Sequence, residues 1–128
     1  MKKYAEVDTS NFPEVRITFT GEKANDENFE QYLQESRQTY DRAEGLAMIF
    51  DASNATVPGI KYQKQQADWL KENEDLMKTY CKGTAYVIPN PIIRTVLKGI
   101  FAFQSQPVPY KVTASVEEAQ QWIAGLNK

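Results

Sequence analysis

The stretch Leu-Ala-Met-Ile-Phe at residues 46–50 and the nine residues after it, Asp-Ala-Ser-Asn-Ala-Thr-Val-Pro-Gly at 51–59, decide the fold. An uninterrupted apolar run of this length, following a helical pattern, is typical of a central strand that is covered on both faces. The small and polar residues after it are typical of a loop. The pattern therefore predicts an interior strand of a layered α/β structure, with a working surface just beyond the end of that strand.

The sequence before this strand predicts a hairpin and one helix. Residues 4–8 and 15–20 suit strands, and the Asn-Phe-Pro-Glu turn at 11–14 joins them as an antiparallel pair. The residues at 25–26 can cap a helix that ends near residue 40. The inner face of this helix, read from the helical spacing, comprises Phe29, Tyr32, Leu33, Ser36 and Tyr40.

After the central strand, helices and strands alternate. We expect a long helix over residues 60–81, a strand over 84–88, a helix over 91–104, an extended segment over 108–113 and a last helix that Ser115 caps. The predicted order is β-β-α-β-α-β-α-β-α. Because strand–helix–strand crossovers pair their strands in parallel and lay the helix on the sheet, this order predicts parallel strands covered by helices.

Length and composition limit the fold and the function classes. A chain of 128 residues suits a single domain over 1–128, which we expect to be an α/β sandwich with a mixed, mostly parallel sheet of about five strands and about four helices. Fifteen basic and seventeen acidic residues give a net charge of -2, so no charge excess attracts nucleic acid. No apolar run is long enough for a transmembrane segment.

The chain contains no histidine and a single cysteine, Cys81. This excludes hydrolysis with an imidazole base, the usual zinc sites and a paired-cysteine redox centre. We therefore predict a protein that is not an enzyme and has neither a metal site nor a cofactor. Cys81 is expected at a helix C-terminus as a buried, inert thiol, and a lone cysteine suits a cytoplasmic location.

The order of predicted elements, with Asp-Ala-Ser at 51–53 closing the central strand, resembles the STAS domain, and more narrowly its SpoIIAA-like branch. The segment Ala-Ser-Val-Glu-Glu-Ala-Gln-Gln-Trp-Ile at 114–123 is similar to the last helix of that branch. The resemblance covers residues 4–126 and implies a non-enzymatic regulatory or protein-interaction module. Antagonists of anti-sigma factors in this family carry a phosphorylatable serine where this chain has Thr-Val-Pro-Gly at 56–59, so the resemblance implies a module without that switch.

The loop after the central strand is the first candidate binding site. Asp51, Ser53, Asn54 and Thr56 lie where open α/β sheets bind their ligands, and Lys61 lies in the first turn of the next helix, whose N-terminus favours anions. The alternative is that Asp51 and Ser53 only satisfy backbone donors of the loop.

The predicted helix over residues 60–81 is the second candidate. Tyr62, Trp69, Leu76 and Tyr80 form a stripe offset from the apolar face that a sheet needs. Aromatic residues are favoured interface anchors, so Tyr62, Trp69 and Tyr80 are predicted contacts for a protein partner or for a second copy of the chain in a homodimer. The alternative is a broad core helix beneath a loop.

The predicted helix over residues 91–104 is apolar around nearly half of its circumference. We expect some of Ile92, Phe101 and Phe103 to exceed what one sheet face can bury. This helix therefore supports a second function, a carrier or sensor of a small apolar ligand held in a cleft. Lipid-binding CRAL-TRIO-like relatives in the same superfamily give the analogy. The alternative is ordinary core packing.

Overall fold

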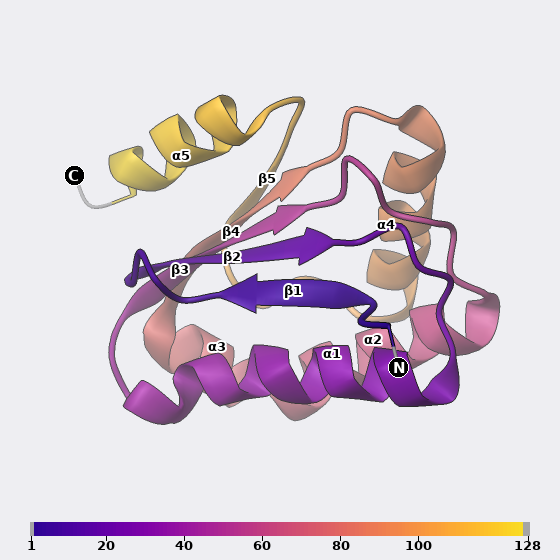
Figure 1. Ribbon diagram of the computed structural model, residues 1–128. Coiled ribbons are helices and arrows are strands. Elements are labelled where there is room, and N and C mark those ends of the chain that lie inside the picture. Colours follow the sequence, from indigo (N-terminus) through magenta and orange to yellow (C-terminus); the bar gives the residue numbers. More distant parts are fainter. Residues whose placement is uncertain (1, 127–128) are drawn as a thin grey trace.

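In the computed structural model, which describes residues 2–126, a five-stranded sheet carries helices on both faces (Figure 1). The strands are β1 (Ala5–Asp8), β2 (Glu14–Phe19), β3 (Leu46–Asp51), β4 (Cys81–Val87) and β5 (Tyr110–Thr113), and they lie side by side in that order. Strand β1 is antiparallel to β2, and the other pairs are parallel. The structure therefore confirms an α/β sandwich with a mixed, mostly parallel sheet of five strands.

The helices form two unequal layers. They are α1 (Asp26–Gln38), continued by the short 3-10 helix η1 (Thr39–Arg42), then α2 (Ile60–Glu72), α3 (Glu74–Tyr80), α4 (Pro91–Phe103) and α5 (Val116–Gly125). Helices α1, α2 and α3 lie along one face of the sheet and α5 lies on the other, while α4 packs beside α2 (Figure 1). The thicker layer thus contains four helices over one sheet face.

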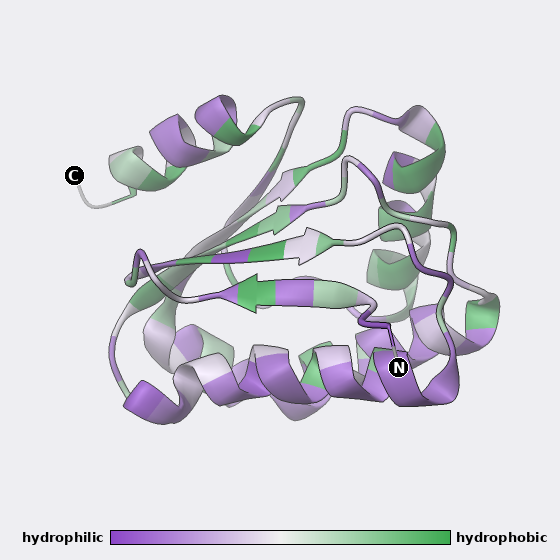
Figure 2. Ribbon diagram, viewed as in Figure 1, coloured by the Kyte–Doolittle hydropathy of each residue, from purple (hydrophilic) through white to green (hydrophobic). Residues whose placement is uncertain are grey.

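Alternation along the strands divides the interior into two cores, because successive side chains of a strand point to opposite faces. Met48 belongs to the large core under α1 and α2, and its neighbour Ile49 belongs to the small core under α5. On β4, Val87 belongs to the small core, and Tyr86 belongs to a third cluster beside α4 that shares Phe50 and Phe101 with the large core. Figure 2 shows apolar residues concentrated on the inner strands and on α4, whereas the outer turns of α1 are hydrophilic.

The predicted single helix over residues 60–81 is wrong, because the chain bends at Asn73, where φ is −107° and ψ is 16°. The Asn73 side chain donates a hydrogen bond to the carbonyl oxygen of Trp69 at 2.9 Å, and its backbone N–H donates to the same oxygen at 3.0 Å. The backbone bond is the ordinary bond of a helix, so the non-helical dihedral angles of Asn73 and its side-chain bond mark the end of α2, and α3 begins at Glu74. Five helices result, and Cys81 opens β4 rather than ending a long helix, although it is buried as predicted.

Helix α5 rests on a glycine of the sheet. Gly83 lies inside β4, and a Cβ atom added there would be 2.5 Å from Cδ1 of Leu126 and 3.2 Å from the carbonyl oxygen of Pro109. The Leu126 and Trp122 contacts are side-chain ends that can shift, whereas the Pro109 contact is backbone, so a larger residue would disturb the packing of α5 side chains and crowd the segment before β5.

We expect the substitution Gly83→Ala to lower the free energy of unfolding by about 1–3 kcal/mol, because it overpacks a close contact. Urea denaturation followed by circular dichroism measures this change. Gly125→Ala is the matched control, since nothing lies within 4 Å of a Cβ atom at that position. Equal stability of the two variants would show that α5 does not depend on close approach to Gly83.

Candidate functional site

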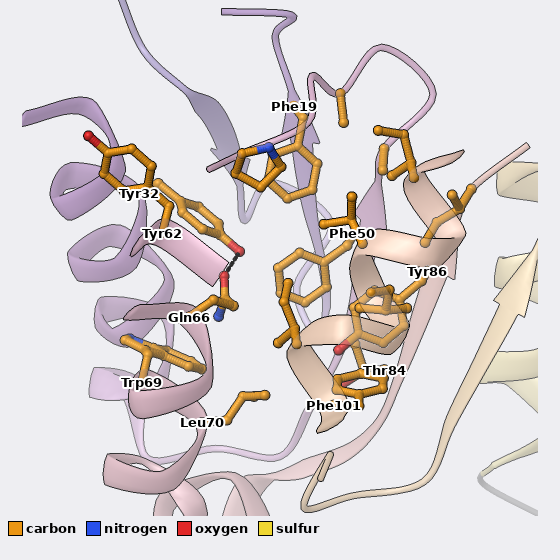
Figure 3. A pocket seen from close by; sticks show the side chains of 18 of the residues that line it. Phe19, Tyr32, Phe50, Tyr62, Gln66, Trp69, Leu70, Thr84, Tyr86 and Phe101 are labelled. Carbon is orange, nitrogen blue, oxygen red and sulfur yellow. Dashed lines mark hydrogen bonds between the residues drawn. The ribbon is translucent and has the colours of Figure 1, made fainter. Parts of the chain in front are cut away.

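An apolar cavity of about 90 Å³ lies between the sheet and helices α1, α2 and α4, and it is partly open to solvent (Figure 3). Its lining side chains are mainly aromatic and aliphatic, and among those described none belongs to Asp, Glu, Lys or Arg. An engineered apolar cavity of about 150 Å³ takes up benzene. The space here is smaller than that, so a single ring or a short chain would fit only by also using the part that is open to solvent.

A row of three rings forms the floor of the cavity. Phe19 on β2, Phe50 on β3 and Tyr86 on β4 follow one another with centroid distances of 6.3 and 5.3 Å and interplanar angles of 20° and 18°. Strand register produces the row, because Phe50 is paired directly with Tyr86. Tyr32 meets Phe19 edge-on at 5.4 Å and Phe101 meets Tyr86 edge-on at 5.9 Å. Such contacts fix ring positions, so the floor is rigid.

Polar groups at the cavity are few and neutral. The Tyr32 hydroxyl donates to Oε1 of Gln66 at 2.7 Å, as drawn in Figure 3, and Nε2 of Gln106 donates to the Tyr86 hydroxyl oxygen. Burial raises the pKa of Tyr32 and of Tyr86 above the ordinary tyrosine value, and it raises the pKa of Tyr4 to about 12. All three phenols therefore stay uncharged near neutral pH. Because an unpaired charge is costly to bury, this cavity suits an uncharged molecule.

The cavity reaches the edge of the sheet where the parallel strands end. Half-buried lining residues at this edge are Ala55 and Thr56 from the loop after β3 and Leu97 from α4. Two large apolar side chains, Ile60 and Ile92, lie in the first turns of α2 and α4 and are each 62% exposed. The edge that the sequence marked as a working surface thus combines an apolar opening with exposed apolar neighbours.

The polar residues predicted in this loop are mostly occupied with the loop itself. Oδ1 of Asp51 accepts hydrogen bonds from the backbone N–H of Ser53 at 3.0 Å and from its hydroxyl at 2.7 Å. The Thr56 hydroxyl donates to the carbonyl oxygen of Glu22 at 3.0 Å, and Asn54 is exposed. Only Thr56 of these four predicted residues lines the cavity. The geometry thus agrees with the structural alternative for Asp51 and Ser53.

Asp26 joins the start of α1 to the start of α2. Its Oδ1 lies 2.8 Å from Nζ of Lys61 and accepts a hydrogen bond from the Tyr62 hydroxyl at 2.9 Å. The hydrogen bond from Lys61, followed by that from Tyr62, lowers the pKa of Asp26. The same contact raises the pKa of Lys61. Lys61, predicted as an anion contact, is therefore paired within the protein, while the Tyr62 ring lines the cavity.

The aromatic stripe of the predicted long helix lies mainly in the core. Trp69 is only 9% exposed, lines the cavity and donates its indole N–H to the carbonyl oxygen of Leu33 on α1 at 3.0 Å. Tyr62 and Tyr80 are half-buried and pack against the large core. This burial favours the core alternative for Trp69 over a contact with a protein partner. Helix α2 packs against α4 as well as α1, so its buried arc is wide.

Helix α4 supplies one wall of the cavity, as its apolar sequence suggested. Phe101 lines the cavity, whereas Ile92 and Phe103 are exposed. Sequence analysis missed the floor and the polar groups, which are Phe19, Phe50, Tyr86, Gln66 and Gln106. An aromatic residue near the end of each of three successive strands was the signal that could have found the floor.

No protein-family model matches this chain, and a search of curated proteins finds no match. Over residues 2–126, no helix has both the length and the apolar character required to cross a bilayer. Within the same residues, no group of three or more Cys, Asp or Glu side chains is placed to hold a metal ion. The cavity is thus the feature of this structure from which a function can be argued.

The substitution Asp26→Asn should loosen the start of α2, because it removes the charge that holds Lys61 and orients Tyr62. We expect faster amide hydrogen exchange over residues 60–63 and little change in Tm, since exposed ion pairs contribute little stability. Hydrogen exchange followed by NMR measures this. Glu27→Gln removes a neighbouring charge at the same helix end and should leave the exchange rates unchanged. Equal exchange in both variants would contradict a fastening role for Asp26.

The same contact has a defined pH dependence. Because the pKa of Asp26 is lowered in the folded protein, the contact is complete above the ordinary aspartate value of about 3.9 and is lost as the pH falls through the lowered value. An NMR titration of the Asp26 carboxyl group should therefore show a midpoint below the ordinary aspartate value of about 3.9. An Asp26 midpoint at or above about 3.9 would contradict the contact.

Proposed function

We propose that this protein is a binding module that holds a small apolar molecule in the cavity between its sheet and helices α1, α2 and α4. The observation that carries the proposal is the cavity itself, which is walled by aromatic and aliphatic side chains and has no charged residue among its described lining. Ligand sites in proteins are typically concave and mostly apolar, with a few placed polar groups that orient the ligand. This cavity has each of these properties.

The size of the cavity limits what it holds. Sites for drug-sized ligands measure about 300–1,000 Å³, which is well above the 90 Å³ present here. The proposed ligand is therefore a molecule no larger than a single ring, or the end of a longer chain whose remainder extends out of the cavity into solvent. Transfer of its apolar surface from water, worth about 25 cal/mol per Å² buried, supplies the driving force.

Binding is proposed here rather than catalysis or a protein contact on α2. The described lining offers phenols, amides and hydroxyls, and burial keeps the phenols of Tyr32 and Tyr86 protonated. Such groups orient a ligand but do not remove protons near neutral pH. The burial of Trp69 withdraws the central residue from the surface that a protein partner would contact.

The two tryptophans allow a direct test. Trp69 lines the cavity, whereas Trp122 belongs to the small core under α5 on the opposite face of the sheet. In the variant Trp122→Phe, Trp69 is the sole tryptophan. We expect a saturable change in its fluorescence when toluene is added, together with a rise in Tm, because a ligand that binds only the folded state stabilises it.

A matched pair of substitutions in this background locates the binding. Ala55→Phe places a ring at the opening and should abolish the saturable change. Ala102→Phe adds the same ring to an exposed position of α4 outside the cavity and should leave the change intact. Native mass spectrometry of freshly purified protein tests for a ligand that copurifies. A response that never saturates, or one that Ala55→Phe does not alter, would overturn the proposal.

A further inference from the structure

We infer that the ligand of this cavity is a neutral carbonyl compound, meaning a ketone or ester on an apolar body, rather than a carboxylic acid. This inference rests on the proposed function and adds the chemical class of the ligand. It comes from the polar atoms at the cavity, which retain hydrogen-bond donors after their contacts within the protein are counted. The two residues concerned are Gln66 and Tyr86.

Gln66 keeps its amide hydrogens. Its Oε1 accepts the hydrogen bond from the buried Tyr32 hydroxyl at 2.7 Å, and this contact fixes which end of the amide faces Tyr32 (Figure 3). The side-chain nitrogen has no hydrogen-bond acceptor among residues 2–126, although Gln66 lines the cavity. An amide nitrogen can only donate. Gln66 therefore offers a donor on the α2 side of the cavity.

Tyr86 keeps its hydroxyl hydrogen. Nε2 of Gln106 donates to the Tyr86 oxygen, and Oε1 of Gln106 accepts from the backbone N–H of Val108 at 3.4 Å. Both ends of the Gln106 amide are thus engaged, and its nitrogen is directed at Tyr86. The hydrogen of the Tyr86 hydroxyl has no acceptor among the described residues. Tyr86 therefore offers a second donor, on the floor of the cavity.

The side-chain carbonyl oxygens at the cavity are already in use, whereas the buried Tyr40 hydroxyl, which also lines the cavity, has no hydrogen-bond partner among the described residues. The side-chain carbonyl oxygens of Gln66 and Gln106 accept hydrogen bonds from Tyr32 and Val108, and no carboxylate is present in the described lining. A hydrocarbon in the cavity would leave the hydroxyl hydrogens of the buried residues Tyr86 and Tyr40 without acceptors, which is unfavourable. A carbonyl oxygen on the ligand would satisfy one of them.

A carboxylate would also accept these hydrogen bonds, but its charge would lack a partner. No lysine or arginine belongs to the described lining. Lys61, in the first turn of α2, is already paired with Asp26 at 2.8 Å. Because burying an unpaired anion is far more costly than burying a carbonyl group, the neutral compound is favoured over an acid of the same shape.

Three molecules of nearly the same shape separate these possibilities. Acetophenone carries a carbonyl group, α-methylstyrene replaces the carbonyl oxygen with a CH2 group, and benzoate replaces the methyl ketone with a carboxylate. Each is titrated against the Trp122→Phe protein, with Trp69 fluorescence as the readout. We expect saturable binding of the two neutral molecules and at least tenfold weaker binding of benzoate at pH 7.

Substitutions then test the donors. Tyr86→Phe and Gln66→Leu should each weaken acetophenone binding by about 3- to 10-fold, which is the range for one hydrogen bond, and should leave α-methylstyrene binding within about twofold. Tyr110→Phe and Gln65→Leu are matched controls that remove the same groups outside the cavity lining, and they should change neither affinity. Retained binding of α-methylstyrene shows that a variant still folds and keeps its cavity.

The outcomes distinguish this inference from the proposed function. Suppose that α-methylstyrene binds, and that Tyr86→Phe and Gln66→Leu bind acetophenone with the same affinity as the Trp122→Phe protein. The carbonyl inference then fails, but the proposed apolar site stands. Benzoate binding as tight as acetophenone binding would overturn the exclusion of acids. If none of the three molecules binds, both the inference and the proposed function are overturned.

Discussion

The structure depends on the position of β3 between two parallel neighbours. Strand β3 pairs with β2 on one side and β4 on the other, and both of its faces are covered, so Leu46, Met48 and Ile49 are almost fully buried. Pairing on both sides supplies backbone partners for this buried strand, with one irregularity in register between Leu46 and Met48 on the β4 side. The alternation of β3 then determines which side chains reach the large core and which lie under α5.

The same pairing creates the cavity. Strand register places Phe50 opposite Tyr86 and near Phe19, so three rings stand on one sheet face where helices α1, α2 and α4 cover it. Ring edges from Tyr32 and Phe101 contact the two ends of the row. Large side chains on a flat floor leave a space that the helices above do not fill completely. The cavity is thus a product of aromatic packing.

Sequence analysis predicted the strands and helices well, because their signals are local. The apolar run at 46–50 and the start of a helix at Pro91 can each be recognised from a few residues of sequence. The break at Asn73 was missed, since it depends on a side chain that bonds back to Trp69. Sequence analysis predicted an apolar cleft only from the wide apolar face of the helix that is now α4. Its floor combines side chains from three strands, and that combination arises from register, which neither periodicity nor spacing reveals.

The lack of charged side chains in the described cavity lining affects how the proposed ligand would bind and leave. Tyrosines are the ionisable groups of its described lining, and burial moves the pKa of Tyr4, Tyr32, Tyr40 and Tyr86 upward, away from neutrality. Occupancy would then be indifferent to acidification and to ionic strength across the range that cells experience. Binding and release would then depend on the free concentration of the ligand and on how far helices α1, α2 and α4 move apart.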